Sequence, residues 1–216
     1  MGRIYALLAF ALACLALASS AASAQPYSSS WRAVDGVFPS DVCWTLVSNS
    51  AVPPALDATK LTLSTTNIAQ NEFYDQGAAA LSLPTLWIIE ARCRRVSGST
   101  TSSLRAPISI QFQRSASQVN LLSIGNGEIF LLASDAARGA TATVPTSDAM
   151  HTYRIEVNGT AIQVFYDGVL TLAGSLYASS GVAAGARIFW GEGSSLVWAC
   201  RSGRPSRTTA ARTPAV

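Results

Sequence analysis

Two runs of alternating apolar and polar residues on either side of Asn158-Gly159 form the clearest pattern in the chain. Alternation with a period of two places the apolar side chains of a strand on one face. Asn-Gly favours the positive φ angles of a type I′ turn, which joins paired antiparallel strands. A second turn signal, Asp167-Gly168, leads to the apolar run Val169–Leu172. The pattern predicts antiparallel strands with one buried face, formed by Tyr153, Ile155, Val157, Ile162, Val164 and Tyr166.

The same period of two recurs along most of the chain, and sustained helical spacing is absent after residue 24. Polar or turn-forming segments between the alternating runs, among them Ser134–Ala149, predict loops. About ten short strands predict an all-β fold, either a two-sheet antiparallel sandwich (jelly roll) or a barrel. Besides the hairpin, the main predicted strands are Trp44–Val47, Lys60–Ser64, Leu86–Arg95, Pro107–Arg114, Gln118–Ile124, Glu128–Ala133 and Ala186–Trp190.

Residues 1–24 have the pattern of a secretory signal peptide. Arg3 precedes an apolar run over Ile4–Ala18, and Ala22-Ser23-Ala24 is a small-x-small cleavage site. The apolar run is shorter than the roughly 20 residues that a membrane-spanning helix needs. We therefore expect a secreted protein, extracellular or periplasmic, with no membrane span and with one folded domain over residues 25–200.

The distribution of charge argues against one class of partner. The whole chain has a formal net charge of +3, but residues 25–200 hold ten basic and twelve acidic residues, a balance of −2. The positive excess lies in Arg3 and in the four arginines after position 200. Because a nearly neutral domain offers no basic surface to a phosphate backbone, we expect no nucleic-acid partner.

Three segments occur in an order and spacing typical of one superfamily. They are Phe38-Pro39 with Cys43-Trp44-Thr45-Leu46 and Lys60-Leu61-Thr62-Leu63, then Leu83–Arg92, then His151–Gly168. Together they resemble the concanavalin A-like lectin/glucanase superfamily, in its laminin-G-like and laminarinase-like branch. The resemblance implies a jelly roll of two antiparallel sheets, one of them concave. It also implies a saccharide on the concave face or at its edge, although other members bind proteins.

The catalytic strand of the glucanase members is missing from this sequence. That strand has the form E-x-D-x-x-E and places two carboxylates on one face, about 5 Å apart in a retaining enzyme. Glu72 and Asp75 are three residues apart, so they fall on opposite faces of a strand. A Ser-His-Asp triad would depend on His151, the only histidine, and no Gly-x-Ser-x-Gly motif is present. We expect a domain without catalytic activity.

Some members of the superfamily hold calcium near the chain ends. Asp35, Asp167 and Glu192 are available as oxygen ligands, but no run of spaced acidic residues forms a calcium loop. We therefore expect no obligatory cofactor and leave calcium open.

Three cysteines follow the predicted signal peptide, Cys43, Cys93 and Cys200. In an oxidising compartment an odd number permits at most one internal bridge and leaves one thiol free. The preferred bridge is Cys43–Cys93, because both residues lie in the patterned part of the chain. Buried or unpaired thiols are the alternative.

The polar faces of the central strands form the candidate ligand site. Amide, carboxylate and guanidinium groups can hydrogen-bond sugar hydroxyls, and the residues expected on such a face are Glu90, Arg92, Gln111, Gln113 and Arg154. The function that these residues favour is glycan binding by a non-catalytic secreted β-sandwich. Two alternatives stay open: a structural or protein-interaction module that binds a surface protein, and a degenerate glycoside hydrolase. The oligomeric state is open as well.

Residues 201–216 differ in composition from the rest of the chain, with Arg, Pro, Thr and Ala but no apolar alternation. The segment is either a disordered extension or the product of a shifted reading frame that has replaced a final strand. In the second case Leu196–Ala199 is a remnant of that strand, and its loss leaves a sheet edge unpaired.

Overall fold

The computed structural model describes residues 29–66, 70–76, 84–97, 104–115, 117–180, 182, 185–192, 197–201 and 206–210. The predicted signal peptide lies outside these ranges. Their regular structure consists of sixteen strands and two short 3₁₀ helices, η1 (Ala33–Asp35) and η2 (Pro39–Asp41). Within these ranges no helix is long and apolar enough to cross a membrane.

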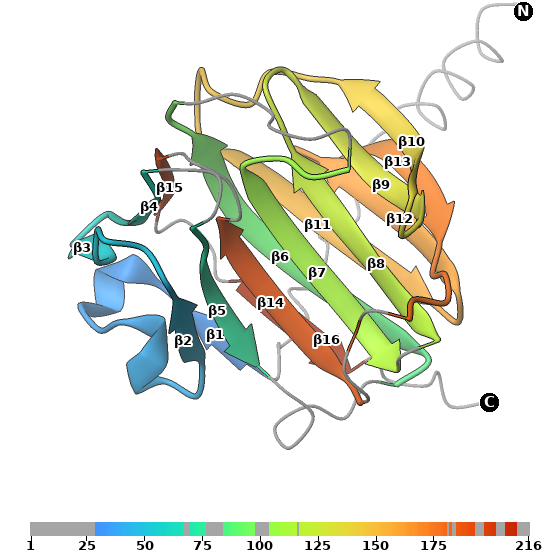
Figure 1. The fold of residues 1–216 in the computed structure, drawn as a ribbon, viewed down its shortest axis with the longest axis horizontal. Helices are drawn as coiled ribbons and strands as arrows, with labels where there is room; N and C mark the ends of the chain where they lie inside the picture. Colours follow the sequence, from blue (N-terminus) through green and yellow to red (C-terminus); the bar gives the residue numbers. More distant parts are fainter. Residues whose placement is uncertain are drawn as a thin grey trace, which may run out of the picture.

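The strands form two antiparallel sheets that lie one behind the other (Figure 1). The predicted all-β, two-sheet jelly-roll sandwich is therefore confirmed, and the barrel alternative is wrong. The seven-stranded sheet has the order β10 (Ala137–Thr143), β9 (Glu128–Ser134), β8 (Gln118–Ile124), β7 (Ile108–Ser115), β14 (Arg187–Glu192), β5 (Glu72–Gln76) and β2 (Thr45–Ser48). The nine-stranded sheet has the order β13 (Val169–Ser175), β12 (Ala161–Tyr166), β11 (His151–Asn158), β6 (Leu86–Arg95), β15 (Val197–Arg201), β4 (Lys60–Ser64) and β3 (Ala55–Asp57), with β16 (Ser206–Ala210) paired to β6 and β1 (Ser29–Trp31) paired to β16.

A continuous apolar core fills the space between the sheets. The alternating positions predicted to face inward on β6, β7, β11 and β12 are buried, with Tyr166 half-buried at one end. Burial of one large apolar side chain stabilises a fold by about 1.5–3 kcal/mol relative to its exposure. The core residues of these four strands are Trp87, Ile89, Ala91, Cys93, Ile108, Ile110, Phe112, Tyr153, Ile155, Val157, Ile162 and Val164.

The turn between β11 and β12 differs from the predicted type. Asn158 pairs with Ala161, so the two-residue loop is Gly159-Thr160, and of these only Gly159 has a positive φ, +62°. A positive φ at the first loop position alone is the pattern of a type II′ turn. The type I′ pattern occurs instead between β12 and β13, where both Asp167 (+48°) and Gly168 (+86°) have positive φ.

Several strands lie where the sequence predicted loops. The residues of β10, inside the predicted loop Ser134–Ala149, are mostly small and alternate between exposed and half-buried at a sheet edge, so they give no apolar signal. Gly139 permits the close pairing of β10 with β9, since a Cβ there would lie 3.2 Å from the Leu132 backbone. The short strands β1, β3 and β5 were also not predicted.

Part of the predicted tail belongs to the nine-stranded sheet. Arg201 ends β15, and Ser206–Ala210 forms β16, which pairs with both β1 and β6. Residues 202–205 and 211–216 lie outside the described ranges, and the disordered or frameshifted tail over residues 201–216 stays a prediction.

The predicted bridge between Cys43 and Cys93 is not formed in the structure, where both residues are free thiols. Cys43 is exposed in the turn before β2, at the edge of the seven-stranded sheet. Cys93 is buried in β6, within the nine-stranded sheet. The two thiols differ in burial and belong to opposite layers of the sandwich, so their shared place in the patterned sequence did not bring them together.

Candidate functional site

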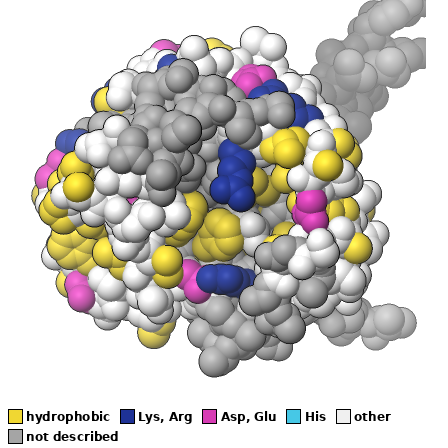
Figure 2. All heavy atoms as spheres, in the orientation of Figure 1, with side chains coloured by type: hydrophobic (Ala, Val, Ile, Leu, Met, Phe, Trp, Pro, Cys, Tyr) yellow, Lys and Arg dark blue, Asp and Glu magenta, His cyan; other side chains and the backbone are white. Residues whose placement is uncertain are grey.

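A cavity of about 520 Å³ opens on the outer face of the seven-stranded sheet, the face turned away from the core. Figure 2 shows this face of the molecule, with hydrophobic and basic side chains near its centre. Since Ile108 and Ile110 face inward, the period of two turns Ser109 and Gln111 of β7 outward. These two residues line the cavity together with Phe73, Leu104, Arg105, Val119, Leu121, Leu132, Asp135, Tyr177, Ser179, Ser180, Val182 and Phe189.

The segment after β13 forms one wall of the cavity and is fixed to the seven-stranded sheet. Val119 and Tyr177 exchange two backbone hydrogen bonds of 3.0 Å each. The Ser180 N–H donates to the Asp135 carboxylate at 3.3 Å. Burial, and after it the hydrogen-bonded Asp135 carboxylate, raise the pKa of Tyr177 to about 12. The wall therefore presents a neutral phenol at physiological pH.

Two half-buried phenylalanines form an aromatic wall. The ring centroids of Phe73 on β5 and Phe189 on β14 are 5.1 Å apart with a tilt of 54°, a favourable separation for an aromatic pair. The Arg187 guanidinium lies 5.6 Å from the Phe189 centroid and donates to both oxygens of Asp75, at 2.6 and 3.0 Å. This ion pair orients the cation beside the ring, and the aromatic faces remain partly open to solvent.

The floor of the cavity is apolar and is tied to the core side by a buried amide. Leu121 and Leu132 belong to a small apolar cluster on this outer face. The Asn120 Nδ2 donates to the carbonyl oxygens of Leu132 (2.9 Å) and Ser175 (2.8 Å). Its Oδ1 accepts from the N–H groups of Leu121 (2.7 Å) and Leu132 (3.0 Å). One fully buried side chain thus holds both floor residues and joins them to β13 of the other sheet.

The five predicted site residues do not form one face. Gln111 lines the cavity, and its Nε2 donates to Gln113 Oε1 at 3.3 Å. Gln113 itself is fully buried, and its Nε2 donates to the Gly185 carbonyl oxygen at 2.7 Å, so it supports the backbone beside the cavity. The alternation was correct for both glutamines, but Gln113 is buried and hydrogen-bonded to the Gly185 backbone.

The other three predicted residues lie on the opposite side of the sandwich, on the outer face of the nine-stranded sheet. Glu90 of β6 is opposite Arg154 of β11, and Arg92 is opposite Thr152. Glu90 is buried, while Arg154 is paired with Glu156 at 2.7 Å. The single wet face predicted from these strands is therefore wrong, because their polar faces point in opposite directions.

The aromatic lining was not predicted, although the sequence holds a signal for part of it. In Arg187–Glu192, Ile188 and Trp190 face the core, so Phe189 is an aromatic residue on the outward side of an alternating strand. Phe73 has no comparable signal, because its inward neighbours in β5 include the polar Glu72. Tyr177 lies in the connection after β13, outside the named strands, so the alternation of apolar and polar residues does not show which way its side chain faces.

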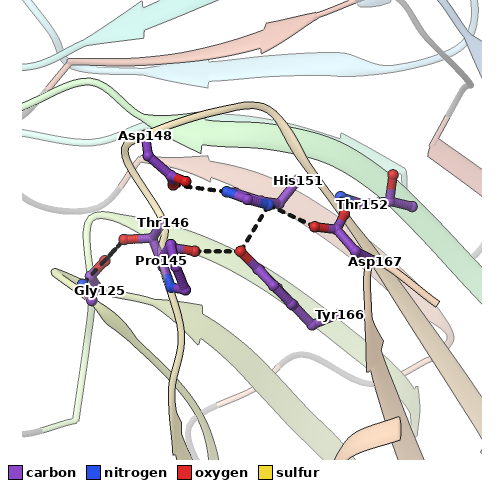
Figure 3. A network of polar contacts seen from close by, with 9 residues as sticks. Gly125, Pro145, Thr146, Asp148, His151, Thr152, Tyr166 and Asp167 are labelled. Carbon is purple, nitrogen blue, oxygen red and sulfur yellow. Dashed lines mark hydrogen bonds and ion pairs between the residues drawn. The ribbon is translucent and has the colours of Figure 1, made fainter. Parts of the chain in front are cut away.

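A second polar cluster, formed around His151, closes one end of the β11–β12 hairpin (Figure 3). His151 Nδ1 lies 2.7 Å from the Asp167 carboxylate, and Nε2 lies 2.9 Å from the Asp148 carboxylate. The Tyr166 ring stacks on the imidazole, with centroids 4.7 Å apart, and its hydroxyl donates to the Pro145 carbonyl oxygen. Since carboxylates only accept hydrogen bonds, an imidazolium with two N–H groups satisfies both partners.

The cluster shifts the pKa of each of its charged members. Burial lowers the pKa of His151, but hydrogen bonds to Asp167 and Asp148 outweigh that effect and raise it above its usual value. The hydrogen bond from His151 lowers the pKa of Asp148. Partial burial raises the pKa of Asp167, and the hydrogen bonds from Thr152 N–H and His151 outweigh it and lower the pKa. No nucleophile is part of this set, which joins a loop to the hairpin.

The acidic residues named for calcium do not converge. Asp35 pairs with Arg32 and Asp167 with His151, while Glu192 is buried. Glu192 stands opposite Glu72 across β14 and β5; both are buried on the core side, and burial raises the pKa of Glu72. Within the described part of the chain, no three His, Cys, Asp or Glu side chains are grouped to hold a metal ion.

Comparison with known proteins finds the fold but no close relative. No protein-family model matches the chain, and no curated protein matches its sequence. The potassium-bound carbohydrate recognition domain of Emp46p matches with a TM-score of 0.59 and 12% identity over 83% of this chain and 95% of that one. The Ca²⁺/Man2-bound exoplasmic/lumenal domain of VIP36 matches with a TM-score of 0.52 and 11% identity over 85% and 88%. A sialidase matches with a TM-score of 0.54 and 14% identity over 80% of this chain and 17% of that one.

These similarities show the fold alone, a two-sheet β-sandwich shared with these solved domains. The resemblance predicted from the three sequence segments is therefore confirmed for the architecture.

Proposed function

We propose that this chain is a secreted, non-catalytic carbohydrate-binding domain whose glycan lies in the cavity on the outer face of the seven-stranded sheet. The supporting observation is that partly open aromatic rings and polar groups line one hollow, with Phe73, Phe189 and Tyr177 beside Gln111. Aromatic faces pack against the C–H face of a sugar ring, and an amide hydrogen-bonds its hydroxyls. A volume of about 520 Å³ is typical of small-molecule sites.

Two further observations support parts of this proposal. Asp135 is the only acidic residue among the described residues that line the cavity, whereas glycoside hydrolysis of the usual kind needs two carboxyl groups. The buried pair Glu72 and Glu192 lies on the other side of the sheet. The signal-peptide pattern of residues 1–24 supports secretion, and carbohydrate recognition is the named role of the Emp46p domain that shares the fold.

A glycan panel tests the proposal, with the purified protein probed first with calcium and then with a chelator. Gln111→Ala removes a cavity amide, and we expect it to weaken binding about tenfold, the effect of losing one or two hydrogen bonds. Gln163→Ala is the matched control, because Gln163 is exposed on β12 of the other sheet; we expect no change. The chelator arm decides whether calcium contributes.

Two outcomes would contradict the proposal. A folded protein that binds no glycan in the panel would favour the protein-interaction alternative. Equal loss of binding in both variants would place the glycan elsewhere on the molecule.

A further inference from the structure

The strand register brings two cysteines that are far apart in the sequence directly opposite each other. Cys93 of β6 pairs with Cys200 of β15 at the end of their antiparallel ladder, and the two preceding pairs, Arg94 with Ala199 and Arg95 with Trp198, have the same register. Opposite Cα atoms in antiparallel strands are separated by roughly 4.5–5.5 Å. Disulfides span Cα separations of roughly 4.4–6.8 Å. The backbone of the two strands is therefore already placed for a bridge.

We propose that Cys93 and Cys200 form a cross-strand disulfide, which staples β15 to the centre of the nine-stranded sheet. In the structure Cys93 is a free thiol, so the bridge is a modification added by oxidation. The reaction is thiol–disulfide exchange with an oxidised low-molecular-weight or protein disulfide. The two cysteine thiols lose two protons and two electrons in forming one S–S bond, and the oxidant leaves as two thiols.

Burial decides when this exchange takes place. Cys93 is almost completely buried, which protects its thiol from an oxidant once the sheet has formed. The exchange therefore accompanies folding, when β15 docks between β6 and β4. Cys43, exposed in the turn before β2, is left as the unpaired thiol. Of the three cysteines after the predicted signal peptide, this assignment pairs the two that the sheet aligns.

The bridge stabilises the C-terminal part of the chain, where the alternation of apolar and polar residues is weakest. Cys200 precedes the segment 201–216, and β15 fills the position between β6 and β4. Closing the long loop between residues 93 and 200 restricts the unfolded chain and stabilises the folded one. The bridge would stabilise the pairing of the last strands, whose sequence shows little alternation of apolar and polar residues.

Peptide mapping after oxidative refolding tests the proposal independently of glycan binding. The full chain is reduced, unfolded and refolded in a mixture of reduced and oxidised glutathione, then alkylated in denaturant without reductant and digested. We expect a peptide pair that joins Cys93 to Cys200 and disappears with reductant, while Cys43 is alkylated. Alkylation of both Cys93 and Cys200, or a linkage of either to another cysteine, would overturn the proposal.

Variants give a second readout. Reductant should lower the Tm of the oxidised protein by about 5 °C or more. Cys43→Ser should keep both the linked peptide and this response, whereas Cys200→Ser should lose both. A wild-type Tm that is insensitive to reductant would contradict the staple. If Cys200→Ser does not fold, the wild-type peptide map still decides whether the bridge forms.

Discussion

The two outer faces of the sandwich both carry polar side chains, but these side chains have different surroundings. On the seven-stranded sheet, Gln111 stands in a hollow between aromatic rings and the segment that begins at Tyr177. On the nine-stranded sheet, Arg154 and Glu156 pair with each other along the strand. The comparison teaches that alternation places polar groups on a face, whereas a binding site also needs walls contributed by distant segments.

The walls exist because the chain passes from one sheet to the other after β13. The backbone hydrogen bonds between Val119 and Tyr177 attach this connection to β8. The Asp135 carboxylate also accepts a hydrogen bond from the Ser180 N–H. This connection brings the Tyr177 ring to the cavity, where it joins Phe73 and Phe189. No short-range pattern in the sequence encodes such a crossing, so it could not be predicted from period alone.

The largest effect that separates the two faces is expected from Asn120, the buried amide beneath the cavity. Asn120→Ala removes four hydrogen bonds and leaves backbone groups of Leu121 and Leu132 without their partner. Unsatisfied buried polar groups and a small void should lower the free energy of unfolding by about 3 kcal/mol. For a protein of this size the Tm should fall by about 6–12 °C.

Chemical denaturation of Asn120→Ala and of the exposed control Gln163→Ala measures this difference. The control should change the free energy of unfolding by less than about 0.5 kcal/mol. A loss below about 1 kcal/mol in Asn120→Ala would mean that water replaces the amide, and that the cavity floor does not depend on it.

Much of the fold could be predicted from the sequence because apolar alternation reports directly on a sheet with one buried face. The inward set of β6, including Trp87 and Ile89, follows from period two alone. The edge strand β10 could not be found in this way, since its small residues are never more than half-buried. The pairing of Ser206–Ala210 with β1 joins segments at opposite ends of the chain, and local sequence carries no information about it.

The candidate site could be predicted only in part, for a related reason. Gln111 and Gln113 have the same local pattern, but Gln111 lines the cavity whereas Gln113 is buried and donates to the distant Gly185 carbonyl oxygen. Glu90 and Arg92 have a pattern equivalent to that of Gln111, but their strand belongs to the opposite layer. Sequence period gives the face of a strand within its own sheet, and the tertiary fold decides which faces meet.

A smaller effect, which depends on pH, is expected at the end of the nine-stranded sheet. The pKa of His151 is raised in the folded state, so its contribution to stability is full below the unfolded pKa of about 6.5 and is lost as pH rises through the folded pKa. The pKa values of Asp148 and Asp167 are lowered, so their contribution is lost as pH falls through those values. The cluster should stabilise the folded state most between about pH 4 and pH 6.5.

Two measurements check this pH dependence. Because His151 is the only histidine, its imidazole NMR signal titrates alone, and we expect its midpoint above the value of a free histidine. The Tm of the wild type should fall between about pH 6 and pH 8 by more than the Tm of His151→Gln, which cannot titrate there. Equal slopes in the two proteins would show that the imidazolium does not stabilise the hairpin.

The smallest effect is expected from Arg154, on the outer face of the nine-stranded sheet. Arg154→Ala removes a partly exposed ion pair with Glu156, and such pairs contribute at most about 1 kcal/mol. We expect a fall in the free energy of unfolding of about 0.5 kcal/mol and no change in glycan binding. Denaturation and the same glycan panel measure both quantities. Weaker glycan binding in Arg154→Ala than in Gln111→Ala would reverse the comparison and move the ligand to the nine-stranded sheet.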